Sequence, residues 1–179
     1  MRTLPGHLIL GHYKCVVEGA GESTWRRAFA IAEVYGLPLA VVVLSLWRGW
    51  QLQSVSALLT AVSILAGGSL SAFTHLSTLR IKLTERANRF QVVDGPERTM
   101  MDHAATHLLM SVLTSVVTCA VLVVALATTP DGNLVSINVT AVTNGLVTYL
   151  GILFLWSVPR LYNAYVEMND VSKSLAGNR

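Results

Sequence analysis

Four polar residues around the start of the third apolar segment form the most chemically suggestive group in the sequence. Asp102, His103 and His107 lie on one predicted helix, and His75 lies at the inner end of the helix before it. His103 and His107 are four residues apart, so their imidazoles share a helix face, and imidazoles at that spacing can bind zinc. Asp102 could orient one ring. The zinc-protease signature has a Glu after its first His, whereas Ala104 stands there in this chain, so that general base is missing.

We interpret this group as polar residues at a membrane boundary, where such side chains are common. His103 and His107 are kept as weak candidates for metal ligands, and pH sensing is the other interpretation because histidine titrates near pH ~6.5. Cys15 and Cys119 should lie at different depths, so we expect two free thiols. The chain has no Walker loop, dinucleotide fingerprint or Gly-x-Ser-x-Gly elbow. We therefore expect no enzymatic activity, no catalytic residues and no cofactor.

The composition is typical of a membrane protein. Apolar residues (AVILMFWYC) make up 53% of the 179 residues, and charged residues make up only 13%. Soluble proteins usually carry roughly 25% charged residues. The formal net charge of +3 could suggest nucleic acid, but the basic residues flank apolar segments, where membrane topology already accounts for them. We expect contact with the lipid bilayer and no direct binding of nucleic acid.

Four segments reach the ~20 mostly apolar residues that a spanning helix needs. They run from Phe29 to Trp47, from Val55 to Leu76, from Ala104 to Leu126 and from Val139 to Val158. Helices satisfy their own backbone hydrogen bonds, as a lipid environment requires. The sequence therefore predicts an all-α polytopic membrane protein with four transmembrane helices, arranged as two hairpins with helical cytoplasmic extensions.

This prediction divides the chain into five parts. They are a cytoplasmic N-terminal segment (1–28), a first transmembrane hairpin (29–76), a basic connecting segment (77–103), a second hairpin (104–158) and a cytoplasmic C-terminal helix (159–179). The connecting segment should continue the second spanning helix until the run Asp94-Gly95-Pro96-Glu97 breaks it. Pro96 suits the first position of the next helix.

Basic residues are distributed very unequally between the two sides of the predicted membrane. Twelve of the 13 Lys and Arg residues fall in the N-terminal, connecting and C-terminal segments, and only Arg48 falls in a loop on the other side. By the positive-inside rule both termini are cytoplasmic. We place the chain in a bacterial inner (plasma) membrane.

Glu33 is the only acidic residue inside a predicted span, about one turn from its start. Intramembrane carboxylates are functional candidates by default. Arg26 and Arg27 lie one to two turns away, so we expect Glu33 to snorkel or to form an ion pair. Pro38 should weaken or kink the same helix.

Two sets of small residues on the middle spans could mediate helix contacts. The second span carries a small-residue face that could form a tight internal contact or an oligomer interface: Ser63, Gly67, Gly68, Ser71 and Ala72. The third span carries hydroxyl residues that could pack between helices or line a weakly polar pore: Ser111, Thr114, Ser115 and Thr118.

The cytoplasmic side offers a candidate surface for a protein partner. Four basic residues should lie on the extension of the second span: Arg80, Lys82, Arg86 and Arg89. The C-terminal helix has an apolar seam with spacings of 3, 4, 3 and 4: Leu161, Ala164, Met168, Val171 and Leu175. This is the a/d pattern of a coiled coil, over only two heptads. The alternatives are anionic lipid for the basic residues and a membrane-surface helix for the seam.

The layout resembles that of several small four-helix bacterial membrane proteins, some of them membrane subunits of antiphage systems that work with a cytosolic partner. Only the hydropathy pattern supports this resemblance, and it transfers no residue roles. Our main hypothesis is a homo-oligomeric, non-enzymatic membrane module that docks a cytosolic protein through its basic cytoplasmic face, and the resemblance adds the expectation of a bacterial defence or signalling complex. The alternatives are an oligomeric pore or ion channel and a small transporter subunit; few deep charges and no paired broken helices disfavour the transporter.

Overall fold

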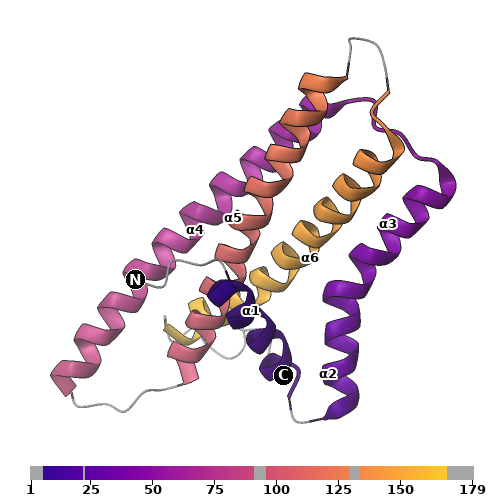
Figure 1. Ribbon diagram of the computed structural model, residues 1–179. Helices are drawn as coiled ribbons and strands as arrows, with labels where there is room; N and C mark the ends of the chain where they lie inside the picture. Colours follow the sequence, from indigo (N-terminus) through magenta and orange to yellow (C-terminus); the bar gives the residue numbers. More distant parts are fainter. Residues whose placement is uncertain (1–5, 22, 91–95, 130–133, 169–179) are drawn as a thin grey trace.

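The computed structural model describes residues 6–21, 23–90, 96–129 and 134–168, and it is helical throughout this part apart from short connections (Figure 1). The helices are α1 (Gly6–Gly19), α2 (Thr24–Ile31), the π-helical turn η1 (Ala32–Gly36), α3 (Leu37–Arg48), α4 (Val55–Phe90), α5 (Pro96–Thr128) and α6 (Ile137–Met168). No strand occurs in the described ranges. The predicted all-α fold is confirmed.

Four stretches of helix are long and apolar enough to cross a membrane: Thr24–Arg48, Val55–Ile81, Met101–Thr128 and Ile137–Asn163. The first is made of α2, η1 and α3. The chain is thus a four-helix membrane protein. Each stretch is longer than the apolar run that predicted it, because the helices continue through polar residues at the membrane boundary. The second stretch begins at the predicted residue, Val55, and is longer only at its C-terminal end. Within the described residues, the helix expected after Pro159 is present to Met168, as a direct continuation of α6 through that proline.

The connection between the second and third spans also follows the sequence pattern. α4 continues past Ile81 to Phe90, and α5 begins at Pro96. A proline is well suited to the first turn of a helix, because its missing N–H would have no intrahelical partner there. Asp94 and Gly95 lie outside the described residues.

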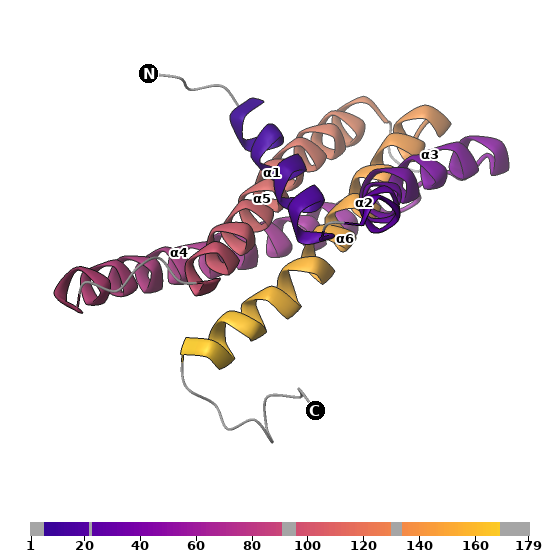
Figure 2. The same ribbon diagram turned by 90° about the horizontal axis from the view of Figure 1, so that it is seen from below.

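The four spans lie side by side in the order α4, α5, α6 and α3 (Figure 1). The helices of the first predicted hairpin, α3 and α4, are therefore at opposite edges of the layer, with the second hairpin between them. The central spans are 39% buried over their most apolar window, against 17% for the edge spans. Seen from below, α1 lies across α5 (Figure 2). It packs against both α5 and α2.

At one end of the layer, which we call the hairpin end, α3 is connected to α4, and the described residues before α6 lie against this connection. The N–H of Leu52 donates to Thr140 Oγ1 at 3.1 Å, and its carbonyl accepts from the N–H of Val135 at 3.3 Å. Leu52 also packs against an apolar cluster that includes Val62 and Leu122. These contacts fix α3 and α4 at opposite edges, because they tie the first loop across the start of α6.

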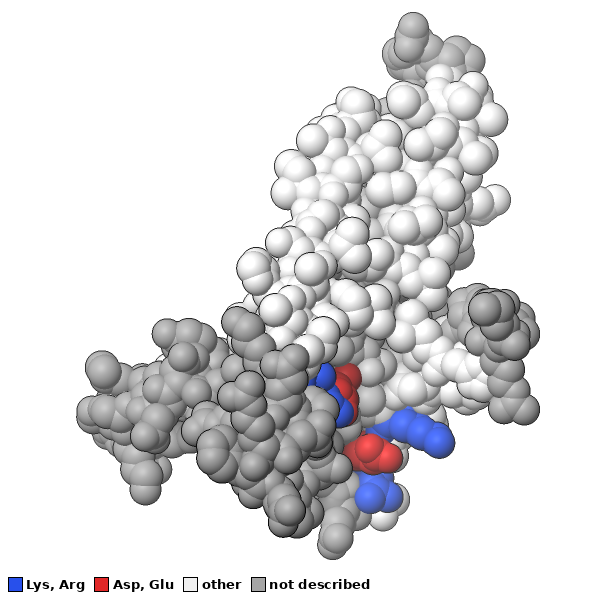
Figure 3. Space-filling view, turned by 90° about the vertical axis from the view of Figure 1, so that its left-hand side faces the viewer, with Lys and Arg blue, Asp and Glu red and all other residues white. Residues whose placement is uncertain are grey.

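The opposite end, which we call the basic end, carries Arg26, Arg27, Arg80 and Arg160. Figure 3 shows one face of the molecule, in which the charged side chains gather at the lower end and the described surface above them carries none. Large apolar side chains such as Ile64, Val124 and Leu155 are exposed along the spans. Such a surface suits lipid, since soluble monomers rarely expose broad apolar patches.

α3 and α6 approach each other closely at Gly145. A Cβ added there would collide with Val42 Cγ2 and would lie 3.4 Å from the carbonyl oxygen of Pro38. Asn144 donates to Ser45 Oγ at 3.1 Å within the same contact. The predicted disturbance at Pro38 takes the form of η1, which ends two residues before it. A π-helical turn shifts the hydrogen-bond register, which relieves the clash of a proline ring with the carbonyl four residues earlier.

Candidate functional site

Two histidines from different helices meet in the interior at the basic end. His12 of α1 and His107 of α5 are fully buried, and their ring centroids are 4.7 Å apart with the planes at 87°. None of the four imidazole nitrogens has a hydrogen-bond partner among the described residues. α1 brings His12 inward because His12, Cys15 and Val16, at i, i+3 and i+4, form its buried face.

Aromatic rings surround this pair. Tyr35 and Tyr149 stack with their centroids 6.0 Å apart, and each lies near His12, at 6.3 Å and 6.2 Å. Trp156 lies 6.2 Å from His107. Tyr35 belongs to η1, so the π-helical turn at Pro38 also sets where this tyrosine meets the site. The pair thus lies in a mainly apolar, polarisable pocket of the protein interior.

A partly buried cation, Arg160, lies next to the site. The guanidinium of Arg160 stacks on Trp156, 5.6 Å from the ring centroid, and its Nη1 is buried without a hydrogen-bond partner among the described residues. Gly19 makes room for it, because a Cβ added at Gly19 would lie 2.7 Å from Arg160 Nη2. Burial, and then the charge of Arg160, lower the pKa of His12 to about 4. His12 is therefore neutral at pH 7.

The two cysteines are free thiols, as predicted. Cys15 is buried on α1 beside the histidine pair, and burial raises the pKa of its thiol. Cys119 lies further along α5, with its Sγ 3.7 Å from Ser63 Oγ. The two are thus on different helices and in different surroundings.

The histidines that the sequence grouped together do not converge on one ligand position. His103 Nε2 lies 3.7 Å from the carboxylate of Glu18, whereas His107 faces His12. Within the described residues, no group of three or more His, Cys, Asp and Glu side chains could hold a metal ion. The arrangement is therefore a buried pair of imidazoles, and the partner of His107 comes from the N-terminal helix.

Asp102 pairs with α4 and not with a histidine. Arg80 donates from Nε to Oδ1 at 2.9 Å and from Nη2 to Oδ2 at 3.1 Å. This bidentate pair ties the ends of two spans together at the basic end. His75, one turn earlier on α4, is exposed.

Glu33 is half-buried beside Trp156, whose indole Nε1 donates to Glu33 Oε1 at 3.3 Å. The expected ion pair with Arg26 or Arg27 is not seen. Arg27 instead donates from Nε to the carbonyl of Gly21 at 2.8 Å, and Glu33 forms no ion pair within the described part of the chain.

The middle of the small-residue face of α4, at Gly67, Gly68 and Ser71, points away from the neighbouring helices. Ser63, Gly67, Gly68 and Ser71 are exposed, and a Cβ added at either glycine would meet nothing within 4 Å. Ala72 is partly buried against a cluster that includes Leu76 and Leu108. The close contact within this chain is at Gly145, so an internal contact does not explain Gly67 and Gly68.

The hydroxyl residues of α5 are buried between helices. Ser111 donates to Ser69 of α4 at 2.9 Å, and Thr114 and Thr118 donate to carbonyls one turn earlier on α5. Ser115 is fully buried, and its hydroxyl has no partner among the described residues. In the single chain these four side chains occupy helix contacts. That these side chains line a pore in an oligomer stays a prediction.

The predicted partner surface is described only in part. Arg80 is engaged with Asp102, and Leu161 is partly buried against a cluster that includes Met101. The side chains of Lys82, Arg86, Arg89, Ala164 and Met168 lie outside the described residues, as do Val171 and Leu175.

The sequence reasoning missed the residues that form the histidine site. His12 comes from α1, Tyr35 from η1, and Tyr149 and Arg160 from α6, and no spacing along the chain links these three elements. One signal was present: Leu8, His12, Cys15 and Val16 fit one face of a short helix. That helix is too short to span a membrane, and it packs against α5.

No protein-family model, curated protein or solved structure matches this chain.

Proposed function

We propose that this protein is a non-enzymatic membrane module that self-associates through α4 and docks a cytosolic protein at its basic end. The observation that supports it best is the open space over Gly67 and Gly68. A membrane subunit of a bacterial defence or signalling complex is the role that the layout suggests.

Self-association is supported by the position of α4. It is an edge helix that packs chiefly against α5, and its glycines lie on the face left exposed. Glycine allows two helix backbones to approach closely, and close packing drives helix association in lipid. Exposed Ile64 and Leu70 lie near the glycines and could pack against a second copy.

The test is co-purification of two differently tagged copies from membranes. Wild type should co-purify with itself, and Gly67→Leu or Gly68→Leu should reduce the yield, because a bulky side chain separates the backbones. Gly151→Leu is the matched control, since Gly151 is also exposed, on α6, with nothing within 4 Å. Unchanged co-purification in both α4 variants, with the fold intact, would mean that these glycines face lipid.

We infer from the charge distribution that the basic end is cytosolic, with both termini on that side. Reporter fusions after Gly132, in the second loop, and after Arg179 test this topology. They should report opposite sides of the membrane. The same side for both would contradict the four-span arrangement.

Docking of a cytosolic protein is supported by the helical extensions. α4 and α6 continue beyond the spans to Phe90 and Met168, so both can present residues outside the membrane. Met168→Asp/Val171→Asp should abolish specific capture of a cytosolic protein while all arginines remain. Arg80 is unsuitable for this test because it pairs with Asp102. Equal capture by a folded, inserted variant would exclude the seam as the docking site.

An oligomeric pore lined by Ser111, Thr114, Ser115 and Thr118 is supported less well. All four side chains are buried at contacts within one chain, whereas subunits around a pore would have to present them to a lumen. Ion flux through liposomes that contain the purified protein is the discriminating measurement. Flux that disappears in Thr114→Val would favour the pore.

A further inference from the structure

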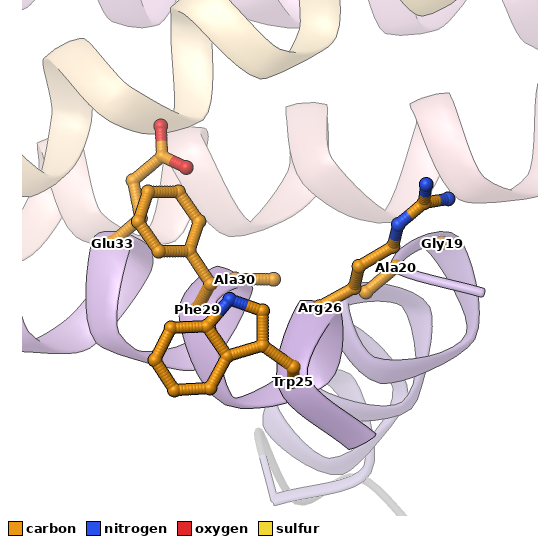
Figure 4. A pocket seen from close by; sticks show the side chains of 7 residues that line it. All are labelled: Gly19, Ala20, Trp25, Arg26, Phe29, Ala30 and Glu33. Carbon is orange, nitrogen blue, oxygen red and sulfur yellow. The ribbon is translucent and has the colours of Figure 1, made fainter. Parts of the chain in front are cut away.

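A shallow pocket opens at the basic end between the turn after α1 and the first half of the first span. Its volume is 530 Å³, and it is lined by Gly19, Ala20, Trp25, Arg26, Phe29, Ala30 and Glu33. Figure 4 shows Arg26 and Glu33 toward opposite sides of it, with the rings of Trp25 and Phe29 between them. The pocket thus combines one cation, one anion and an apolar wall.

The two charges of the pocket do not neutralise each other. Arg26 and Glu33 form no ion pair with one another or with any other described residue. They are seven residues apart on one helix, which is about 10 Å along its axis at ~1.5 Å per residue. Trp156 donates to Oε1 of Glu33 and so fixes the carboxylate, leaving Oε2 to accept from a ligand.

The pocket lies where a phospholipid headgroup would be. Trp25 is 78% exposed and Phe29 is 64% exposed, at the start of a membrane span. Aromatic side chains prefer the headgroup level of a bilayer. Arg160 lies close to Gly19, one of the lining residues, so a second cation near the pocket adds to the attraction for phosphate.

We propose that this pocket binds a zwitterionic phospholipid with a primary ammonium, such as phosphatidylethanolamine. The phosphate contacts the Arg26 guanidinium, the ammonium donates to Glu33, and an acyl chain runs along Phe29 and Trp25. Phosphate and ammonium are joined by two carbons, and a charge-assisted hydrogen bond of about 2.8 Å at each end lets them bridge the separated charges. An anionic glycerol headgroup offers Glu33 no cation, and a choline headgroup has no N–H to donate.

The test is the retention of lipid by the purified protein after reconstitution with equal amounts of phosphatidylethanolamine, phosphatidylglycerol and phosphatidylcholine, measured by native mass spectrometry. Wild type should retain phosphatidylethanolamine preferentially. Glu33→Gln should reduce that preference by about tenfold, the value of one charge-assisted hydrogen bond of roughly 1.4 kcal/mol. Arg26→Gln should weaken retention of all three lipids, and Arg26→Lys should restore part of it.

Arg48→Gln is the matched control, because Arg48 lies at the hairpin end beside an exposed Trp47 without an acidic partner in the described part of the chain. It should leave the preference unchanged. Each variant is first checked for helix content and thermal stability, and Arg26→Lys serves if Arg26→Gln fails to fold. Equal retention of the three lipids by wild type, or an unchanged preference in folded Glu33→Gln, would overturn the proposal.

Discussion

The imidazole of His12 meets that of His107 edge to face, with the ring centroids 4.7 Å apart and both side chains fully buried. This contact joins a short helix that does not span the membrane to the third span. Buried polar groups without hydrogen bonds cost free energy, so the contact must be supported by the packing around it. Val16 and Val34, both buried in one cluster nearby, contribute to that packing.

The histidine contact predicts that the protein is less stable in mild acid. The pKa of His12 is about 4 in the folded chain, below the ordinary 6.5 of the unfolded chain. Between these pH values the unfolded chain binds more protons, so the free energy of unfolding falls as the pH falls from 6.5 towards 4, by up to about 3 kcal/mol. Above pH 6.5 this effect is constant.

Thermal unfolding in detergent at pH 7.5 and pH 5 checks this prediction. His12→Leu should lose less stability on acidification than wild type, because it removes the titrating ring. His7→Leu, an exposed histidine on the same helix, should behave as wild type does. His103, His107, Arg160, Tyr35 and Tyr149 remain around the site in both variants. An identical pH dependence in His12→Leu would show that another group is responsible.

Gly145→Ala should destabilise the protein by about 1–3 kcal/mol, because the added methyl collides with Val42 in the contact between α3 and α6. Gly151→Ala, on the same helix with open space around it, should be neutral or stabilising by up to about 1 kcal/mol, since alanine favours helix. Denaturation midpoints measure both. Val42→Ala should rescue Gly145→Ala, and a lack of rescue would place the strain elsewhere.

Arg80 and Asp102 should couple weakly despite their bidentate geometry. Their side chains are 35% and 56% exposed, and exposed ion pairs contribute about 0.2–1 kcal/mol. A double-mutant cycle with Arg80→Gln and Asp102→Asn isolates the pair from the other interactions of Arg80. The coupling should decrease at high salt. A coupling that salt does not change would indicate a pair shielded from solvent.

The spans and their ends could be predicted from the sequence because the membrane imposes a length and a composition. Pro96 begins α5 as expected, and Pro38 disturbs the first span. The lateral order of the helices could not be predicted in this way. It depends on contacts such as those of Leu52 with Thr140 and Val135, which join residues more than eighty positions apart.

The candidate site was harder to predict from the sequence, because it too depends on contacts between residues that are far apart in the chain. The i, i+4 spacing of His103 and His107 is visible in the sequence, yet each ring turns to a different partner on α1. The positions of glycine residues likewise did not predict which helices pack closely. Gly67 and Gly68 match the small-xxx-small pattern and stand in open space, whereas Gly145 matches the same pattern with Ala141 and makes the tight contact, so the pattern alone does not distinguish the two sites.

Disulfide cross-linking in native membranes is the sharpest test of self-association through α4. Cys15 and Cys119 are first replaced by Ala, and a single cysteine is then placed at Gly67, Gly68 or Gly151. Two cysteines can bridge only when their Cβ atoms are about 3.5–4.5 Å apart. Gly67→Cys or Gly68→Cys should give a cross-linked dimer on oxidation, and Gly151→Cys should not. No dimer at either α4 position, or equal dimer at Gly151, would contradict self-association through α4.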